Sequence, residues 1–251
     1  MTHWLIPDWP APVNVRAAIT TRTGGVSEGP YRSWNLGAHV GDDPRAVARN
    51  REILRQQLGL PAEPHWLSQV HGCLVAEAAT SAPGFEADAI CARQAGQVCA
   101  VLTADCLPLL ICDRSGQRVC AVHAGWRGLA AGVIEAALAR LERPGSELLV
   151  WLGPAIGPKA FEVGEEVYTS FVSQAQEAKA AFTASRPGHW LADIYQLARI
   201  RLGRAGVGYV GGGEYCTVTD SEQFFSYRRD GVTGRMASLI WLESAELEEK
   251  S

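Results

Sequence analysis

Three short apolar runs follow one another between Gln97 and His123, and they constrain the fold of this 251-residue chain more than any other feature. The runs read QVCAVLTADC, LPLLICDRSG and QRVCAVHAGW, and polar or glycine-containing breaks separate them. Runs of this length that are rich in Val and Leu and bounded by such breaks are typical of buried strands. The pattern therefore predicts three central strands.

Helical patterns lie on both sides of these runs. Asp43 and Pro44 supply an N-cap and a first helical residue for AVARNREILRQQLG, which Gly59 can close. Further elements are expected in order: a helix in GLAAGVIEAALARLERPG, a strand in ELLVWLG, helices near 164–176 and 192–204, and a last strand in RMASLIWL. This order predicts a layered α/β protein with mixed sheets, built as one domain over residues 1–251.

Composition and charge exclude several classes of protein. The formal charge of −4 argues against a surface made to neutralise nucleic-acid phosphates. The first residues do not resemble a signal peptide, and no segment reaches the roughly 18 apolar residues of a membrane span. We therefore expect a cytoplasmic protein that binds neither nucleic acid nor membrane. The seven cysteines include no CxxC pair, and most lie in or beside apolar runs, so we expect them to be reduced and mostly buried.

Three residues stand out as candidates for chemistry because each follows or ends a predicted strand beside small residues. They are His71 in QVHG, Cys106 in ADC and His123 in AVHAGWRG. Two imidazoles and a thiolate could hold one catalytic zinc ion with an open position. The spacing alone also allows a cysteine nucleophile with His123 as its base, or buried thiols with hydrogen-bonded histidines.

Two long segments rich in Gly and Arg, TTRTGGVSEGPYRSWNLGAHVGDD and FFSYRRDGVTGR, are expected to be loops that line a binding site. Arginine binds phosphate or carboxylate in a bidentate manner, so arginines in these loops and beside His123 suggest an anionic co-substrate. The candidate substrate-binding residues are Arg22, Arg127, Arg228 and Arg229. His39 in the first loop, and Asp105 and Glu162 as proton carriers, are weaker candidates for which local structural roles are favoured.

Eight ordered motifs extend this interpretation: TTRTGGVS, NLGAHVGDD, QVHG, ADC with LPLLICD, AVHAGWRG, GPAIGP, FEVG and FFSYRRDGVTGR. In these motifs the chain resembles the YfiH-like "laccase domain" family, which is also labelled polyphenol oxidase, over Thr20 to Leu242. The resemblance implies an α/β/β/α sandwich with mixed sheets and one zinc ion per chain held by His71, Cys106 and His123.

The resemblance also implies an activity. It points to phosphorolysis of adenosine, inosine and methylthioadenosine, together with deamination of adenosine, so that purine nucleosides and phosphate would be the partners. A copper-dependent oxidase is disfavoured because multicopper sites need many histidines and this chain has six. The alternative that the family suggests is a cytoplasmic hydrolase that edits muramyl peptides of the cell wall. It would use the same three zinc ligands.

Overall fold

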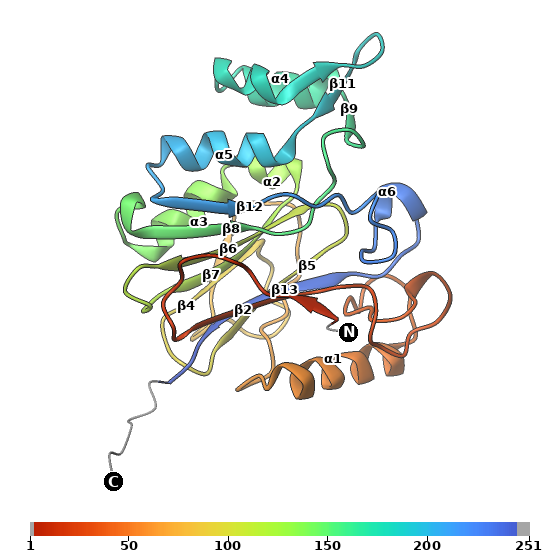
Figure 1. Cartoon of the computed structure of the whole chain (residues 1–251), viewed down its shortest axis with the longest axis vertical. Helices are drawn as coiled ribbons and strands as arrows, with labels where there is room; N and C mark the ends of the chain where they lie inside the picture. The colour runs from red at the N-terminus through yellow and green to blue at the C-terminus, as the bar shows by residue number, and fades with distance from the viewer. Residues whose placement is uncertain (1–2, 245–251) are drawn as a thin grey trace.

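The computed structural model describes residues 3–244 and contains two main β-sheets that pack face to face (Figure 1). The larger sheet has six strands, which are in spatial order β12 (Tyr209–Gly212), β8 (Leu148–Leu152), β6 (Leu107–Asp113), β7 (Val119–Ala124), β4 (Ala89–Ala92) and β3 (Val75–Glu77). The smaller sheet is antiparallel, in the order β1 (Trp4–Leu5), β2 (Val15–Thr20), β13 (Met236–Leu242) and β5 (Val98–Thr103).

The three predicted strands are confirmed as β5, β6 and β7, and every residue in them is buried. They do not belong to one sheet, however. Strand β5 is an edge strand of the smaller sheet, and β6 and β7 are inner strands of the larger one. A continuous apolar run shows burial on both faces but not which sheet a strand joins. Side chains such as Ile19, Val101 and Leu110 fill the space between the two sheets.

Helices cover the outer face of each sheet. Helix α1 (Pro44–Leu58) packs on the smaller sheet through Leu54 and other residues, with Asp43 as its N-cap and Gly59 at its end, as predicted. Helices α2 (Trp126–Ala131), α3 (Val133–Leu141) and α5 (Ile194–Arg204) cover the larger sheet. The layers therefore follow the order α/β/β/α, as expected for the fold.

Two predicted helices differ from the structure. The segment after Arg127 forms two helices because Gly132 adopts a left-handed φ of 95°, which ends α2. The helix expected over 164–176 is the shorter α4 (Glu165–Val172), followed by a 3-10 helix over Gln176–Ala181. Helix α4 lies with a third sheet, which sequence analysis missed, in the order β10 (Phe182–Ala184), β11 (His189–Ala192) and β9 (Glu162–Gly164).

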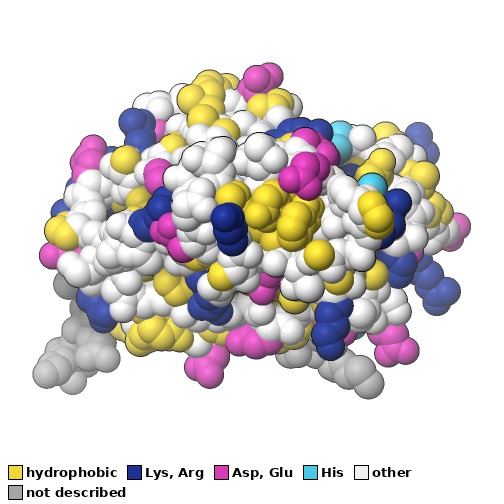
Figure 2. All heavy atoms as spheres, turned by 90° about the horizontal axis from the view of Figure 1, so that it is seen from above, with side chains coloured by type: hydrophobic (Ala, Val, Ile, Leu, Met, Phe, Trp, Pro, Cys, Tyr) yellow, Lys and Arg dark blue, Asp and Glu magenta, His cyan; other side chains and the backbone are white. Residues whose placement is uncertain are grey.

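The small third sheet and α4 form the end of the molecule that lies uppermost in Figure 1. Viewed from that end, the surface mixes basic and acidic side chains around a central group of apolar ones, without a broad basic area on this face (Figure 2). Within residues 3–244, no helix is both long and apolar enough to cross a bilayer.

Candidate metal centre and pocket

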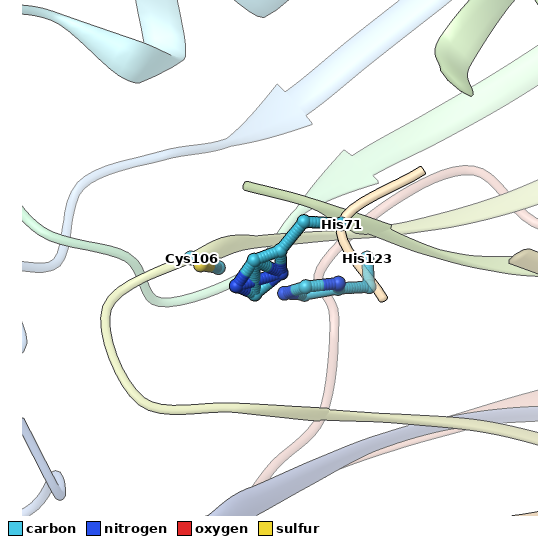
Figure 3. Close-up of side chains that lie close together, drawn as sticks. All are labelled: His71, Cys106 and His123. Carbon is cyan, nitrogen blue, oxygen red and sulfur yellow. The ribbon is translucent and has the colours of Figure 1, made fainter. Parts of the chain in front are cut away.

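His71, Cys106 and His123 converge although they come from three separate segments of the chain (Figure 3). One ligand atom from each side chain lies within 4.8 Å of the other two. The rings of His71 and His123 are tilted by 40°, with centroids 4.9 Å apart. Burial decreases from His123, which is buried, through Cys106 to His71, which is exposed. The group is therefore closed on the His123 side and open on the His71 side.

The strand register explains why these residues meet. Leu107 of β6 pairs with Ala124 of β7, so Cys106, which precedes β6, lies beside the end of β7 that carries His123. The turn into α2 must also come close to the thiol. A Cβ on Gly125 would lie 3.1 Å from Cys106 Sγ, so a larger residue at this position would press on the sulfur atom.

The two histidines of the group differ in charge near pH 7. Burial alone would lower the pKa of His123, but the Cys106 thiolate and the hydrogen bond with Asp88 outweigh it and raise that pKa to about 9. Burial, together with the neighbouring His123 and Arg127, lowers the pKa of His71, so its imidazole is neutral near pH 7. Without a metal, His123 is therefore an imidazolium near pH 7 that must release a proton to bind a metal ion, whereas His71 is already neutral.

The donor set meets the requirements of a zinc site. Two imidazole nitrogens and one thiolate are ligands that zinc accepts, and three protein ligands leave one position for water or substrate. In a tetrahedral zinc site the ligand atoms lie roughly 3.5 Å apart. The three ligand atoms here lie within 4.8 Å of one another, so small side-chain movements would complete this geometry. The same donor types also bind copper, so the donors alone do not choose between the two metals.

The metal centre opens into a pocket of about 290 Å³. His71, Cys106 and Gly125 lie in its wall, and the aromatic residues Trp126 and Tyr227 are part of the lining. The other lining residues are Ala104, Asp105, Arg127, Ile156, Phe161, Ile194 and Arg228. An apolar and aromatic lining with a few polar groups is typical of sites for small organic ligands.

Of the four predicted arginines, Arg127 and Arg228 line this pocket. The Arg127 guanidinium lies 4.4 Å from the centroid of the Trp126 ring, and no hydrogen bond or ion pair to the rest of residues 3–244 engages it. Arg228 lies over Phe161, and its Nη1 donates to the Glu162 carbonyl oxygen at 2.9 Å. Both guanidinium groups therefore keep donors for a ligand.

The other two arginines are used differently. Arg22 donates to the carbonyl oxygens of Arg32 and Ser221. Arg229 donates to the carbonyl oxygens of Thr217, Val218 and Phe224, and it pairs with Asp230. Neither side chain is part of the pocket lining. These contacts give Arg22 and Arg229 the role of holding loops together, a role that the sequence did not distinguish from substrate binding.

The two proton-carrier candidates, Asp105 and Glu162, also make local contacts. Asp105 lines the pocket, but its two carboxylate oxygens accept hydrogen bonds from Thr217 Oγ1 at 2.6 Å and from the Arg228 backbone at 2.7 Å. The Glu162 carboxylate binds Arg186 and Ser185. Of the two predicted loops, only the later one supplies lining residues, and it contains the short helix α6 (Tyr227–Asp230).

A family model described as multi-copper polyphenol oxidoreductase laccase matches residues 16–243 of the chain. The chain belongs to this laccase family. All eight motifs that suggested the YfiH-like laccase domain lie within the matched residues, so this resemblance is confirmed. The description names copper, whereas residues 3–244 contain one group of three residues that could hold a metal ion.

Relatives in the laccase family have other names. The chain is 59% identical over 244 residues to a purine nucleoside phosphorylase of Pseudomonas aeruginosa, covering 97% of this chain and 100% of that protein. It is 52% identical to purine nucleoside phosphorylase YfiH of Escherichia coli, with 96% and 100% covered. Among solved structures, a Neisseria meningitidis protein is 54% identical with a TM-score of 0.94, covering 97% of this chain and 100% of that one.

A second solved structure, YlmD of Geobacillus stearothermophilus, is 32% identical with a TM-score of 0.90 and covers 97% of each chain. The fold of this chain is thus shared by solved structures at 54% and at 32% sequence identity. Sequence analysis of this laccase-family chain missed one residue beside the metal centre, Asp88, and the pocket residues Trp126, Phe161 and Tyr227. Asp88 precedes strand β4, a short apolar element that no sequence pattern marked.

Proposed function

We propose that this protein is a zinc-dependent purine nucleoside phosphorylase that also deaminates adenosine. One observation carries the proposal: a three-ligand metal centre opens into a pocket whose lining includes the guanidinium groups of Arg127 and Arg228. The names of the relatives from Pseudomonas aeruginosa and Escherichia coli support the same activity.

The metal is proposed to be one zinc ion per chain. Blue-copper sites add a weak axial ligand, commonly a methionine, to two histidines and one cysteine. Of the two methionines, Met236 is buried with Phe224 and Phe225, and its sulfur accepts the Phe225 N–H at 3.1 Å. Met1 lies outside the described residues. The open position at His71 favours a catalytic zinc.

The pocket residues can be assigned to parts of the substrates. Phosphorolysis uses phosphate as the nucleophile at ribose C1′, so a free dianion has to be held beside the nucleoside. Arg127 and Arg228 provide charged donors for phosphate. Trp126, Phe161 and Tyr227 offer aromatic faces against which a purine can stack. A zinc ion held by His71, Cys106 and His123 would supply Lewis-acid chemistry and would lower the pKa of a bound water.

The test is product identification. Purified protein is incubated separately with adenosine, inosine and methylthioadenosine, with and without phosphate, and the products are separated and identified. Adenine and ribose 1-phosphate that form only with phosphate, together with inosine in both samples, would support the proposal. If inosine, adenosine and methylthioadenosine all remain unchanged, the proposal is wrong. Hydrolysis of muramyl peptides by the same sample would then favour the cell-wall hydrolase.

A further inference from the structure

Asp88 hydrogen-bonds to both histidines of the metal centre and does not line the pocket. It is fully buried and lies immediately before β4, between the segment that carries His71 and strand β7, which carries His123. The sheet order explains this position. Ala89 pairs with Val122 of β7 on one side and with Val75 of β3 on the other, so Asp88 lies next to both segments.

On the β7 side, Asp88 holds His123 by two contacts. The backbone N–H of His123 donates to the Asp88 carbonyl oxygen at 2.7 Å, and His123 Nδ1 lies 2.7 Å from Asp88 Oδ1. A carboxylate only accepts hydrogen bonds, so Nδ1 carries the proton of this contact. The other ring nitrogen, Nε2, is then the one left with a lone pair for a metal ion.

On the other side, Asp88 holds the backbone around His71. Oδ1 accepts the His71 N–H at 2.9 Å, and Oδ2 accepts the N–H groups of Gly72 at 2.7 Å and Val70 at 3.2 Å. His71 has a φ of 61°, a left-handed conformation that residues other than glycine seldom adopt. Three hydrogen bonds to one buried carboxylate stabilise this conformation and so direct the imidazole of His71.

We propose that Asp88 is the positioning residue of the metal centre, and that it sets the zinc affinity by fixing the ring nitrogen that His123 presents and the backbone that presents His71. The proposal rests on the zinc site proposed above. An amide in place of the carboxylate would turn one acceptor into an N–H₂ donor. That donor would face either the His123 Nδ1–H or the N–H groups of Val70 and Gly72, so the side-chain amide of an Asp88→Asn variant could not satisfy both sides.

The first test measures the zinc affinity of Asp88→Asn by competition with a chromophoric chelator. We expect a 10- to 100-fold loss relative to the unaltered protein, which is about the range measured for partners of metal-bound histidines. The matched control is Asp113→Asn. Asp113 is also buried and accepts two backbone N–H groups, from Gln117 and Arg118, but it lies at the other end of β6 from Cys106. The zinc affinity of the Asp113→Asn variant should not change.

The second test needs no variant and covers the case in which Asp88→Asn fails to fold. In the zinc-loaded unaltered protein, ¹⁵N NMR should find His123 with a protonated Nδ1 and a zinc-bound Nε2. Three results would overturn the proposal. The first is zinc bound to Nδ1 of His123. The others are a folded Asp88→Asn variant with unaltered zinc affinity, and an Asp113→Asn variant that loses as much zinc affinity as Asp88→Asn. Neither readout uses turnover. Zinc binding without phosphorolysis would refute the proposed function and leave the role of Asp88 standing, and a chain that binds no zinc would refute both.

Discussion

The exchange of Cys106 for alanine separates a metal ligand from a catalytic nucleophile. If Cys106 is a ligand, the Cys106→Ala variant keeps only two of the three donors, and among residues 3–244 no fourth His, Cys, Asp or Glu belongs to the group. Zinc content and activity should then fall together. If Cys106 is a nucleophile, the activity of Cys106→Ala should fall, and this activity should not depend on the metal content.

The size of the effect can be estimated from the number of donors. Structural zinc sites with four protein ligands bind with about 10–16 kcal/mol, so one donor contributes about 2.5–4 kcal/mol. This corresponds to a roughly 100- to 1,000-fold rise in the Kd for zinc. Cys216 is a suitable matched control, because its thiol is also partly buried and accepts the Gly157 N–H at 3.3 Å outside the metal centre. Cys216→Ala should keep its zinc.

The assay combines chelator competition, turnover of adenosine with phosphate, and labelling of Cys106 by an alkylating reagent. Cys106 is partly exposed in the pocket, so the reagent can reach it. Bound zinc should protect the thiolate, a chelator should increase labelling while it stops turnover, and added zinc should reverse both effects. Full turnover in a metal-free sample, lost only when Cys106 is alkylated, would refute the ligand assignment.

Three further predictions concern the pocket and the fold. Arg127→Ala and Arg228→Ala should each raise the KM for phosphate by roughly 10- to 100-fold and affect deamination less, because each loses a charged hydrogen bond worth about 1.5–3 kcal/mol. The matched control is Arg204→Ala, which changes an exposed arginine. Equal losses in phosphorolysis and deamination would contradict the prediction. Tyr227→Ala should raise the KM for adenosine by about 5- to 100-fold if the ring stacks on the purine, a loss of about 1–3 kcal/mol; an unchanged KM in steady-state kinetics would exclude stacking. Burial alone would raise the pKa of Asp113, but its hydrogen bonds lower it, so its stabilisation is present above the unfolded-state pKa of about 3.9 and is lost as pH falls through the lower folded value. Asp113→Asn should therefore unfold at lower urea concentration at pH 7, and the difference from the unaltered protein should shrink below about pH 4; a constant difference would be inconsistent with this pKa.

Much of the scaffold follows from local sequence patterns. Asp43, Pro44 and Gly59 mark the ends of α1 because capping depends on residues within one turn of the helix end. Strands β5, β6 and β7 follow from their apolar runs. Their division between two sheets cannot be predicted from local patterns, because strand pairing is a contact between distant segments.

The metal centre was also predictable from the sequence only in part. Residue type and strand ends marked His71, Cys106 and His123, and the structure brings these three together. Asp88 could not be found by such signals, since its role arises from pairing of β4 with β7 and β3. The arginines of the loops were indistinguishable in sequence. The structure separates them by position, because Arg127 and Arg228 line the pocket and Arg22 and Arg229 do not.

The most direct test of the proposed function is a titration of metal-free protein with zinc, followed by the rate of phosphorolysis of adenosine. One group of three ligands should bind one ion, so the rate should rise linearly and level off at one zinc per chain. A parallel titration with copper should not restore this rate. A rate that is independent of zinc, or activity that appears only with several copper ions per chain, would contradict a single catalytic zinc held by His71, Cys106 and His123.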